Sequence, residues 1–379
     1  MTYRAIGLMS GSSLDGLDIA FVEFNESGGK WKYEIKAADC YEYPADWVVQ
    51  LKNAINFTAY DYQLLHTSYG KYIGEQVNKF IQHYGLEHQV QLIASHGHTT
   101  FHAPHAGMTG QLGDGAAIAA TTEINVVSDL RALDVAFGGQ GAPIVPVGEK
   151  LLLTDFSYFL NVGGIANISF NGPDGYVAFD VCAANRVLNM LAQLDGKEYD
   201  AGGELAATGN IDTSLLTKLN ALAYYKKSFP KSLANSFGVD EVYPLIQSFN
   251  LDTNDALRTY TEHIAMQIGY ALAEVKGLRF KVEGESNKHS EITSREPETI
   301  LVTGGGAFNT FFIKRLTEVL QGLNIEVVVP DALLVNYKEA LVMALIGVLR
   351  WREEYNVLHT VTGAKRSSIG GAVWIGQEA

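Results

Sequence analysis

The chain has 379 residues, with 28 lysines and arginines against 42 aspartates and glutamates and a formal net charge of −14. Such an acidic balance argues against nucleic acid or an anionic membrane surface as a partner, and leaves small ligands bound at local sites. At ~100–200 residues per domain, the length predicts two or three domains or one large two-lobed unit.

Cysteine content and hydropathy favour a cytoplasmic protein. Two cysteines, Cys40 and Cys182, cannot make a disulfide framework, and the first residues run directly into a strand pattern without a separate apolar signal segment. The longest apolar run, near 340–349, is shorter than the ~20 residues that cross a bilayer, so we expect a buried core helix there and no membrane span.

Glycine is the residue that departs from average, with 38 glycines against only 9 prolines. This is about a tenth of the chain, where about 7% is usual. Glycine without proline is not typical of a linker. It predicts tight turns where backbone approaches backbone or a ligand.

The first part of the chain has a β-β-β-α-α pattern. Alternating and short apolar runs predict strands at 5–9, 17–24 and 31–40, and helical spacing predicts helices at 47–56 and 62–84. A strand at 90–95, a loop rich in histidine and glycine, a helix at 116–122 and a strand at 125–129 follow.

The pattern then starts again at about residue 158. We expect strands at 158–162, 166–170 and 175–181, helices at 186–194, 213–224 and 255–276, and then 299–303 (strand), 308–322 (helix), 325–329 (strand), 337–355 (helix) and 372–375 (apolar end). The repeat predicts an α/β fold with two lobes, each a mixed sheet flanked by helices. We expect an N-terminal lobe over 1–150 and a C-terminal lobe over 151–379, whose last helix is free to cross back.

Two glycine-rich turns are candidate phosphate sites. The turn from Gly11 to Asp18 combines two glycines, two hydroxyls and two carboxylates, so it is either a phosphate loop with a nearby Mg²⁺ ligand or a plain hairpin turn. Gly304, Gly305 and Gly306 lie between a strand and a helix expected near Phe308. They either let a nucleotide approach the backbone at the helix end or allow close strand-to-helix packing.

Polar residues at strand ends are further candidates. The segment with His96, His98, His102 and His105 is either a metal site or a loop in which His96 and Thr99 hydrogen-bond a polar ligand. Asp180, at the expected end of a strand, is either a general base or the N-cap of the next helix.

The motifs together resemble the anhydro-N-acetylmuramic acid kinase family, of the sugar kinase/actin-like ATPase superfamily. The resemblance runs nearly end to end, in order. It is carried by the segments 6–18, 95–99, 102–104, 113–114, 129–131, 138–143, 160–167, 304–306, 339–341 and 361–364. The fold implied is the two-lobed actin-like ATPase (ribonuclease H-like) fold, in which each lobe is a mixed sheet of the five-stranded type flanked by helices.

The resemblance implies an ATP-dependent kinase that opens the 1,6-anhydro ring of anhydro-N-acetylmuramic acid with water and phosphorylates O6, in cell-wall sugar recycling. Asp180 would be the catalytic base, and Mg²⁺ would be bound by Asp15 or Asp18. The implied sugar ligands are His96, Thr99, Arg131 and Glu339. The implied ATP ligands are Gly11, Ser12, Ser13, Leu14, Asp15, Gly16, Leu17, Asp18, Gly304, Gly305 and Gly306. A homodimer is expected from the family.

The sequence departs from the family after Asp180, where the usual Thr-Gly-Pro-Gly-Asn is replaced by residues 181–185, Val-Cys-Ala-Ala-Asn. Two glycines are lost, so we expect added Cβ atoms to crowd a loop that should approach sugar or phosphate. The family's arginines near Arg131 and its Thr-Gly-Arg-Glu after Ser232 are also replaced. These changes keep two alternatives open: a kinase for a different anhydro or free sugar, and an ATP-binding relative with little turnover.

Overall fold

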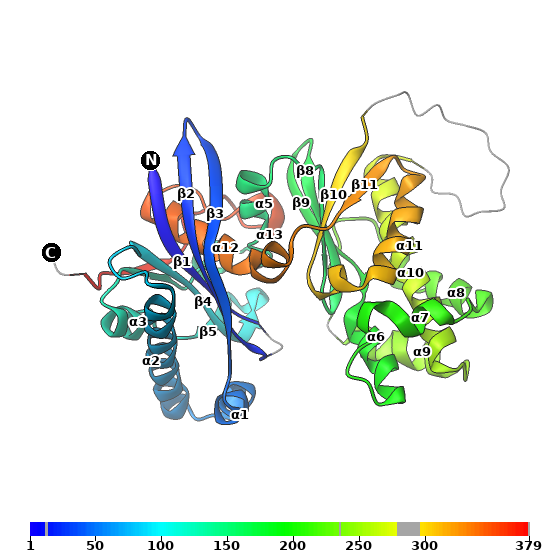
Figure 1. Ribbon diagram of the computed structural model, residues 1–379, viewed down its shortest axis with the longest axis horizontal. Helices are drawn as coiled ribbons and strands as arrows, with labels where there is room; N and C mark the ends of the chain where they lie inside the picture. The colour runs from blue at the N-terminus through cyan, green and yellow to red at the C-terminus, as the bar shows by residue number, and fades with distance from the viewer. Residues whose placement is uncertain (12–13, 235, 279–295, 378–379) are drawn as a thin grey trace. The chain divides into compact units, whose positions relative to one another are not determined.

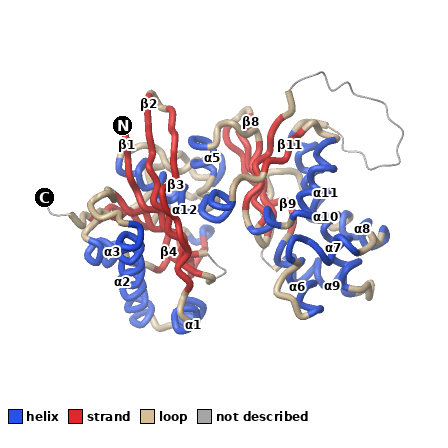
Figure 2. Tube along the Cα trace, viewed as in Figure 1, coloured by secondary structure: helices blue, strands red, loops and turns tan. Residues whose placement is uncertain are grey.

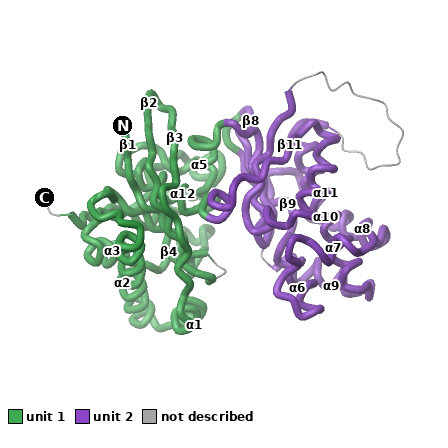
Figure 3. The backbone as a smooth tube through the Cα atoms, viewed as in Figure 1, with its two compact units in different colours: residues 1–154, 174–176, 337–379 green, residues 155–173, 177–336 purple. Residues whose placement is uncertain are grey.

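The computed structural model describes residues 1–11, 14–234, 236–278 and 296–377 (Figure 1). It contains two compact units (Figure 3). Unit 1 comprises 1–154, 174–176 and 337–379, and unit 2 comprises 155–173 and 177–336. The sequence placed the boundary at 150/151 and left the last helix of the C-terminal lobe free to cross back. The two compact units divide at 154/155, and the segment 337–379 belongs to unit 1.

Unit 1 is built on a mixed sheet of seven strands (Figure 2). Its strands are β1 (Thr2–Ser10), β2 (Gly16–Ser27), β3 (Lys30–Glu42), β4 (Leu92–Ala103), β5 (Met108–Leu112), β6 (Val126–Ser128) and β12 (Ala372–Trp374). Its helices are α1 (Ala45–Asn53), α2 (Ala59–Tyr84), α3 (Gly115–Thr122), α4 (Ala132–Ala136), α5 (Pro146–Leu152) and α13 (His359–Thr362), together with most of α12 (Ala332–Trp351).

Unit 2 has a sheet of five strands. The strands are β7 (Tyr158–Val162), β8 (Ile165–Gly172), β9 (Gly175–Ala183), β10 (Glu298–Thr303) and β11 (Ile325–Val328). The helices are α6 (Asn185–Ala192), α7 (Glu204–Thr208), α8 (Thr213–Asn220), α9 (Tyr243–Gln247), α10 (Thr253–Val275) and α11 (Thr310–Gln321).

The two sheets share one strand order, which confirms the repeat expected from the sequence. The order β3-β2-β1-β4-β6 in unit 1 matches β9-β8-β7-β10-β11 in unit 2. β1 pairs antiparallel with β2 and parallel with β4, and β4 pairs parallel with β6. In unit 2, β7 likewise pairs antiparallel with β8 and parallel with β10, and β10 pairs parallel with β11. The expected two-lobed α/β fold is therefore confirmed. Unit 1 exceeds the expected five strands because β5 pairs with β4 and β12 pairs with β6.

The segment after the expected strand 90–95 forms a hairpin, although its histidines and glycines predicted a loop. β4 continues through this segment to Ala103 and pairs with β5. Cross-strand pairing thus outweighs the poor strand propensity of this composition.

Alternation along β1 explains how helices cover both faces of the unit 1 sheet. Ile6 and Leu8 point into a core that they share with buried residues of α2. Gly7 points the other way, where a Cβ atom would collide with the carbonyl of Ala340 in α12. Since any side chain at Gly7 would push α12 off the sheet, this glycine is required by packing.

Helix α12 corrects one expectation about the apolar run. It has 20 residues, and its most apolar 18-residue window has a mean hydropathy of 1.7, so by length and composition it is long enough to cross a membrane. However, 67% of that window is buried inside the molecule, including Ala340 to Leu349, as in a core helix.

Candidate functional site

The turn between β1 and β2 carries the first group of predicted ligands in unit 1. Ser12 and Ser13 lie outside the described residues. Gly11 accepts a hydrogen bond from the amide of Leu14 at 3.4 Å, and Leu14 has a left-handed φ of 61°. Gly16 and Leu17 are buried strand residues, and a Cβ at Gly16 would lie 2.6 Å from Cys40 Sγ. Packing therefore explains Gly16 and Leu17 without a ligand.

Asp18 lies beside this turn, within electrostatic range of two further carboxylates. Burial raises the pKa of Asp18 to about 6; a hydrogen bond from Cys40 opposes this shift, and the charges of Glu339 and Asp15 add to it. The structure thus brings together both predicted metal ligands and one predicted sugar ligand. Mutual repulsion of carboxylates is relieved by a cation, and carboxylate oxygens suit Mg²⁺.

Arg131 and His96 form a second predicted pair in unit 1. The Nε–H of Arg131 donates to Nε2 of His96 at 2.8 Å, and the ring Nδ1 lies 2.8 Å from the carbonyl of Gly97. His96 is therefore the neutral tautomer with its proton on Nδ1. Burial and the charge of Arg131 lower the pKa of His96 to about 3, which keeps the ring neutral.

The charge of Arg131 connects this pair to Glu339. Burial lowers the pKa of Arg131 to about 10, and the charges of Glu339 and Asp134 oppose that shift. Thr99, the remaining predicted sugar ligand, is exposed on β4 and accepts a hydrogen bond from Gln111 at 3.4 Å. Four predicted residues (Asp18, Glu339, Arg131, His96) are thus linked by bonds or charge, whereas Thr99 shares only the strand of His96.

A buried polar chain that the sequence did not reveal lies under the turn. Tyr69 and Tyr43 are hydrogen-bonded at 2.6 Å, the Tyr43 hydroxyl donates to Ser10 at 2.8 Å, and Ser10 lies 3.3 Å from His98 Nδ1. Ser10 directly precedes Gly11, so this chain anchors the start of the turn. Its members come from β1, β4, α2 and the loop between β3 and α1, which leaves no spacing signal in the sequence.

Asp180 is the predicted catalytic residue in unit 2. Its carboxylate Oδ2 accepts hydrogen bonds from the amide of Leu233 at 2.8 Å and from the hydroxyl of Ser232 at 3.3 Å. Burial raises the pKa of Asp180, and these two bonds oppose the shift. β9 continues past Asp180 to Ala183, and Ala184 is the N-cap of α6, so the alternative role as a helix cap is wrong.

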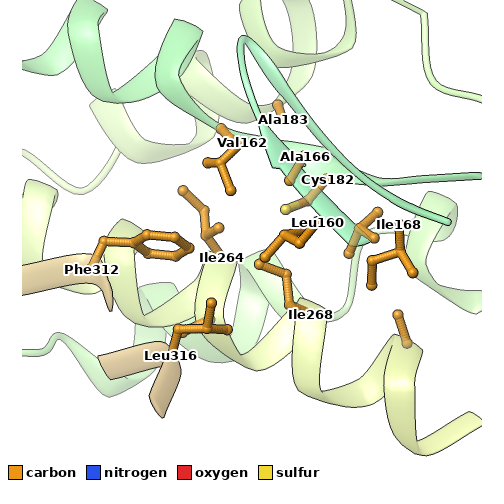
Figure 4. Packing of buried hydrophobic residues seen from close by; sticks show 14 of the residues in the cluster. Leu160, Val162, Ala166, Ile168, Cys182, Ala183, Ile264, Ile268, Phe312 and Leu316 are labelled. Carbon is orange, nitrogen blue, oxygen red and sulfur yellow. The ribbon is translucent and has the colours of Figure 1, made fainter. Parts of the chain in front are cut away.

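The residues that replace the family loop after Asp180 lie in the core of unit 2. Val181, Cys182, Ala183 and Ala184 are between 0 and 2% exposed. Figure 4 shows Cys182 and Ala183 among side chains of the sheet and of α10, such as Leu160 and Ile264. The expectation that their Cβ atoms crowd a ligand-facing loop is therefore wrong, since these side chains are used in core packing.

The three glycines of the 304–306 turn in unit 2 fall into two classes. Gly304 has a φ of 80°, and a Cβ there would lie 2.7 Å from Asn161 Oδ1, while one at Gly306 would collide with Val162. A Cβ at Gly305 would meet only Asn185 Nδ2, at 3.5 Å. Packing thus requires Gly304 and Gly306, and it gives no reason for Gly305, which therefore fits close approach of a ligand.

The helix after these glycines begins later than expected. A 3-10 turn spans Gly305–Phe308, and α11 starts at Thr310. The side chain of Asn309 caps α11 by accepting from the amide of Phe312 at 2.9 Å. Part of the positive helix end is thus satisfied by Asn309 and does not lie at Gly304.

Two further glycines, Gly202 and Gly203, lie beside this turn and were not singled out in the sequence. Thr310 donates its hydroxyl proton to the carbonyl of Gly202 at 3.1 Å, and a Cβ at Gly203 would collide with Asn309. The Gly-Gly dipeptide in a segment expected to have no regular structure was the available signal.

The family model and the curated relatives match nearly the whole chain. Residues 3–376 match the model of the family described as "Anhydro-N-acetylmuramic acid kinase". Proteins of that name from Gloeobacter violaceus, Francisella tularensis subsp. novicida and Haemophilus influenzae are 32%, 31% and 29% identical; they are covered over 96%, 97% and 97% of their length, and this chain over 96%, 97% and 97%.

Among solved structures, the activator of the 2-hydroxyisocaproyl-CoA dehydratase from Clostridium difficile with bound ADPNP aligns with 92% of this chain and 96% of its own, at 14% identity and a TM-score of 0.43. The family model spans nearly every residue, and the relatives align from end to end. The chain therefore belongs to the anhydro-N-acetylmuramic acid kinase family, a family of carbohydrate kinases.

Proposed function

We propose that the protein opens the 1,6-anhydro ring of anhydro-N-acetylmuramic acid with water and phosphorylates O6 with ATP. The water oxygen forms a new bond to C1 while the bond between C1 and O6 breaks. O6 then takes the γ-phosphoryl group of ATP, and one proton is released from the water. The products are N-acetylmuramic acid 6-phosphate and ADP.

The observation that carries this proposal is the state of the Asp180 carboxylate. It is half-buried, its pKa is raised by burial, and two donors hold one of its oxygens. A carboxylate held in this way keeps its orientation and gains basicity, as a general base requires. Asp180 would take the proton from the attacking water.

The sugar would be bound by residues of unit 1. Arg131 is a fixed donor because His96 and the carbonyl of Gly141 hold its guanidinium, the latter at 2.5 Å. Arg131 would bind the carboxylate of the muramic acid moiety, because a guanidinium matches carboxylate geometry. Glu339 would accept from sugar hydroxyl or amide groups, and the exposed Thr99 would supply a hydroxyl.

The nucleotide would be bound by backbone groups of the turn after Gly11 and by the 304–306 turn, where Gly305 is open to a ligand. Mg²⁺, when bound at Asp15 and Asp18, would offset the negative charge of the phosphates. Among the described residues, no group of three or more His, Cys, Asp or Glu side chains is placed to hold a metal. Phosphate and water oxygens would therefore supply most of the ligands.

The test is an assay of purified protein with ATP and Mg²⁺. Anhydro-N-acetylmuramic acid should gain the mass of one water and one phosphoryl group while ADP forms in equal amount. A panel with free N-acetylmuramic acid and other anhydro sugars tests the alternative substrates. Turnover of a different sugar alone would replace the substrate, and ATP binding without any sugar phosphate would overturn the kinase proposal.

We also propose that the protein works as a cytoplasmic homodimer on a small-molecule sugar. Light scattering coupled to size-exclusion chromatography should give twice the mass of one chain. A monomer that retains full activity would overturn the dimer.

A further inference from the structure

Asp180 lies on β9, an edge strand of the unit 2 sheet. The backbone of Asp180 is held by a segment that is not a strand. Its N–H donates to the carbonyl of Lys231 at 3.0 Å, and its carbonyl accepts from the hydroxyl of Tyr224 at 2.7 Å. Both main-chain groups of Asp180 are therefore fixed by residues of the segment 224–233.

The same segment also holds the side chain, and it does so asymmetrically. The amide of Leu233 and the hydroxyl of Ser232 both donate to Oδ2. Within the described part of the chain, no hydrogen bond to Oδ1 accompanies them. Two donors on one oxygen fix the rotation of the carboxylate and leave the other oxygen as the acceptor.

We propose that Ser232 is a positioning residue that, together with the Leu233 amide, holds Oδ2 of Asp180 so that Oδ1 accepts the proton of the attacking water. This inference rests on the proposed function. Ser232 acts through Asp180 and does not itself touch the reacting atoms. Tyr224 has a separate part, because its hydroxyl bonds the carbonyl of Asp180 and not the carboxylate.

The two contacts have different electrostatic consequences. A hydrogen bond to an ionised carboxylate favours the charged form, so its loss raises the pKa of Asp180. A hydrogen bond to the main-chain carbonyl fixes position and leaves the pKa of the carboxylate nearly unchanged. Variants of Ser232 and Tyr224 therefore differ in their pH profiles, which a merely structural role would not produce.

The experiment compares the pH dependence of kcat for Ser232→Ala, Ser232→Thr and Tyr224→Phe. Ser232→Ala should lower kcat about three- to tenfold and move the acid limb up by about half a pH unit, as expected for one hydrogen bond to a charged group. Ser232→Thr keeps the hydroxyl and should restore both values. Tyr224→Phe should lower kcat without moving the limb. Ser236→Ala, an exposed serine of the next turn, is the matched control.

Two results would overturn the proposal, and they are distinguishable. If Ser232→Ala keeps the kcat and acid limb of the unchanged protein while Asp180→Asn is inactive, Ser232 has no positioning role and the proposed function stands. If Asp180→Asn itself keeps full turnover, the proposed base is wrong, and the role of Ser232 fails with it. Thermal unfolding of each variant establishes that the compared proteins are folded.

Discussion

Arg131 donates its Nε–H to Nε2 of His96, which fixes a guanidinium against a neutral imidazole. The ring cannot take a proton at Nε2 without losing this bond, and burial already lowers the pKa of His96 to about 3. The pair therefore keeps one arrangement across the physiological pH range, and Arg131 presents its remaining donors in a constant direction.

Arg131→Lys should weaken sugar use while leaving ATP binding unchanged. A lysine cannot bond His96 and the carbonyl of Gly141 at once, so the site loses a charged hydrogen bond worth ~1.5–3 kcal/mol. We expect kcat/KM for the sugar to fall about 10- to 100-fold. Arg366→Lys is the control, because Arg366 is exposed and stacks on Phe137. Equal losses in both variants would contradict a specific role for Arg131.

Asp180→Asn should remove the base without removing the nucleotide site. General base catalysis contributes about 10²–10⁴-fold, so turnover should fall by that factor while the Kd for ATP stays constant. Calorimetry measures the Kd for ATP, and an enzyme-coupled assay of ADP release measures turnover. Asp240→Asn, at an exposed carboxylate in unit 2, should leave both unchanged. A matching loss of ATP affinity in Asp180→Asn would indicate a wider structural change.

The pH dependence of turnover should show an acid limb from Asp180. Burial raises the pKa of this carboxyl above its ordinary 3.8, with the bonds from Leu233 and Ser232 opposing. Because the base must be ionised, kcat reaches its full value above the raised pKa of Asp180. It falls as the pH drops through that pKa. The kcat profile, recorded at saturating sugar and ATP, should therefore have its midpoint above pH 3.8. A midpoint at or below that value would remove Asp180 from the profile.

Gly305→Ala and Gly304→Ala should separate ligand binding from folding. The Cβ at Gly305 meets no closer atom than Asn185 Nδ2, so Gly305→Ala should fold normally and bind ATP about tenfold less tightly, a loss of ~1.4 kcal/mol. Gly304→Ala forces a left-handed alanine against Asn161 and should lower the free energy of unfolding by ~1–3 kcal/mol. Gly322→Ala, at an open position in the same unit, is the control. Unchanged ATP affinity in Gly305→Ala would contradict a ligand at this turn.

Thr362→Val should destabilise unit 1. The hydroxyl of Thr362 donates to Oδ1 of the buried Asp134 at 2.7 Å, while the amide of Gly141 donates to Oδ2 at 2.7 Å. Loss of one donor leaves a buried charge partly unsatisfied, which costs ~1–3 kcal/mol in the free energy of unfolding. Denaturant titration measures this loss in the free energy of unfolding. Thr360→Val, at an exposed threonine of the same short helix, should change stability by less than ~0.5 kcal/mol.

The sequence predicted most strands and helices because their apolar periodicity is strong. It failed at 96–112, where pairing with β1 and β5 decides the structure and local composition does not. The separate residues of the site were also named from motifs. Their grouping was not predictable, since Asp18 and Glu339 come from opposite ends of the chain and meet only through the packing of α12 on β1. The bond from Ser232 to Asp180 likewise depends on the fold of 224–233.

The segment 224–233, which holds the main chain of Asp180, has a consequence for contacts between copies of this chain. A strand at the border of a sheet offers its free amides and carbonyls to any extended chain nearby, which promotes aggregation. At Asp180 both groups are already bonded, to Lys231 and Tyr224. An incoming strand would have to displace that segment before it could pair there. The bonds that fix the backbone of the proposed base therefore also block strand addition to the sheet edge at Asp180.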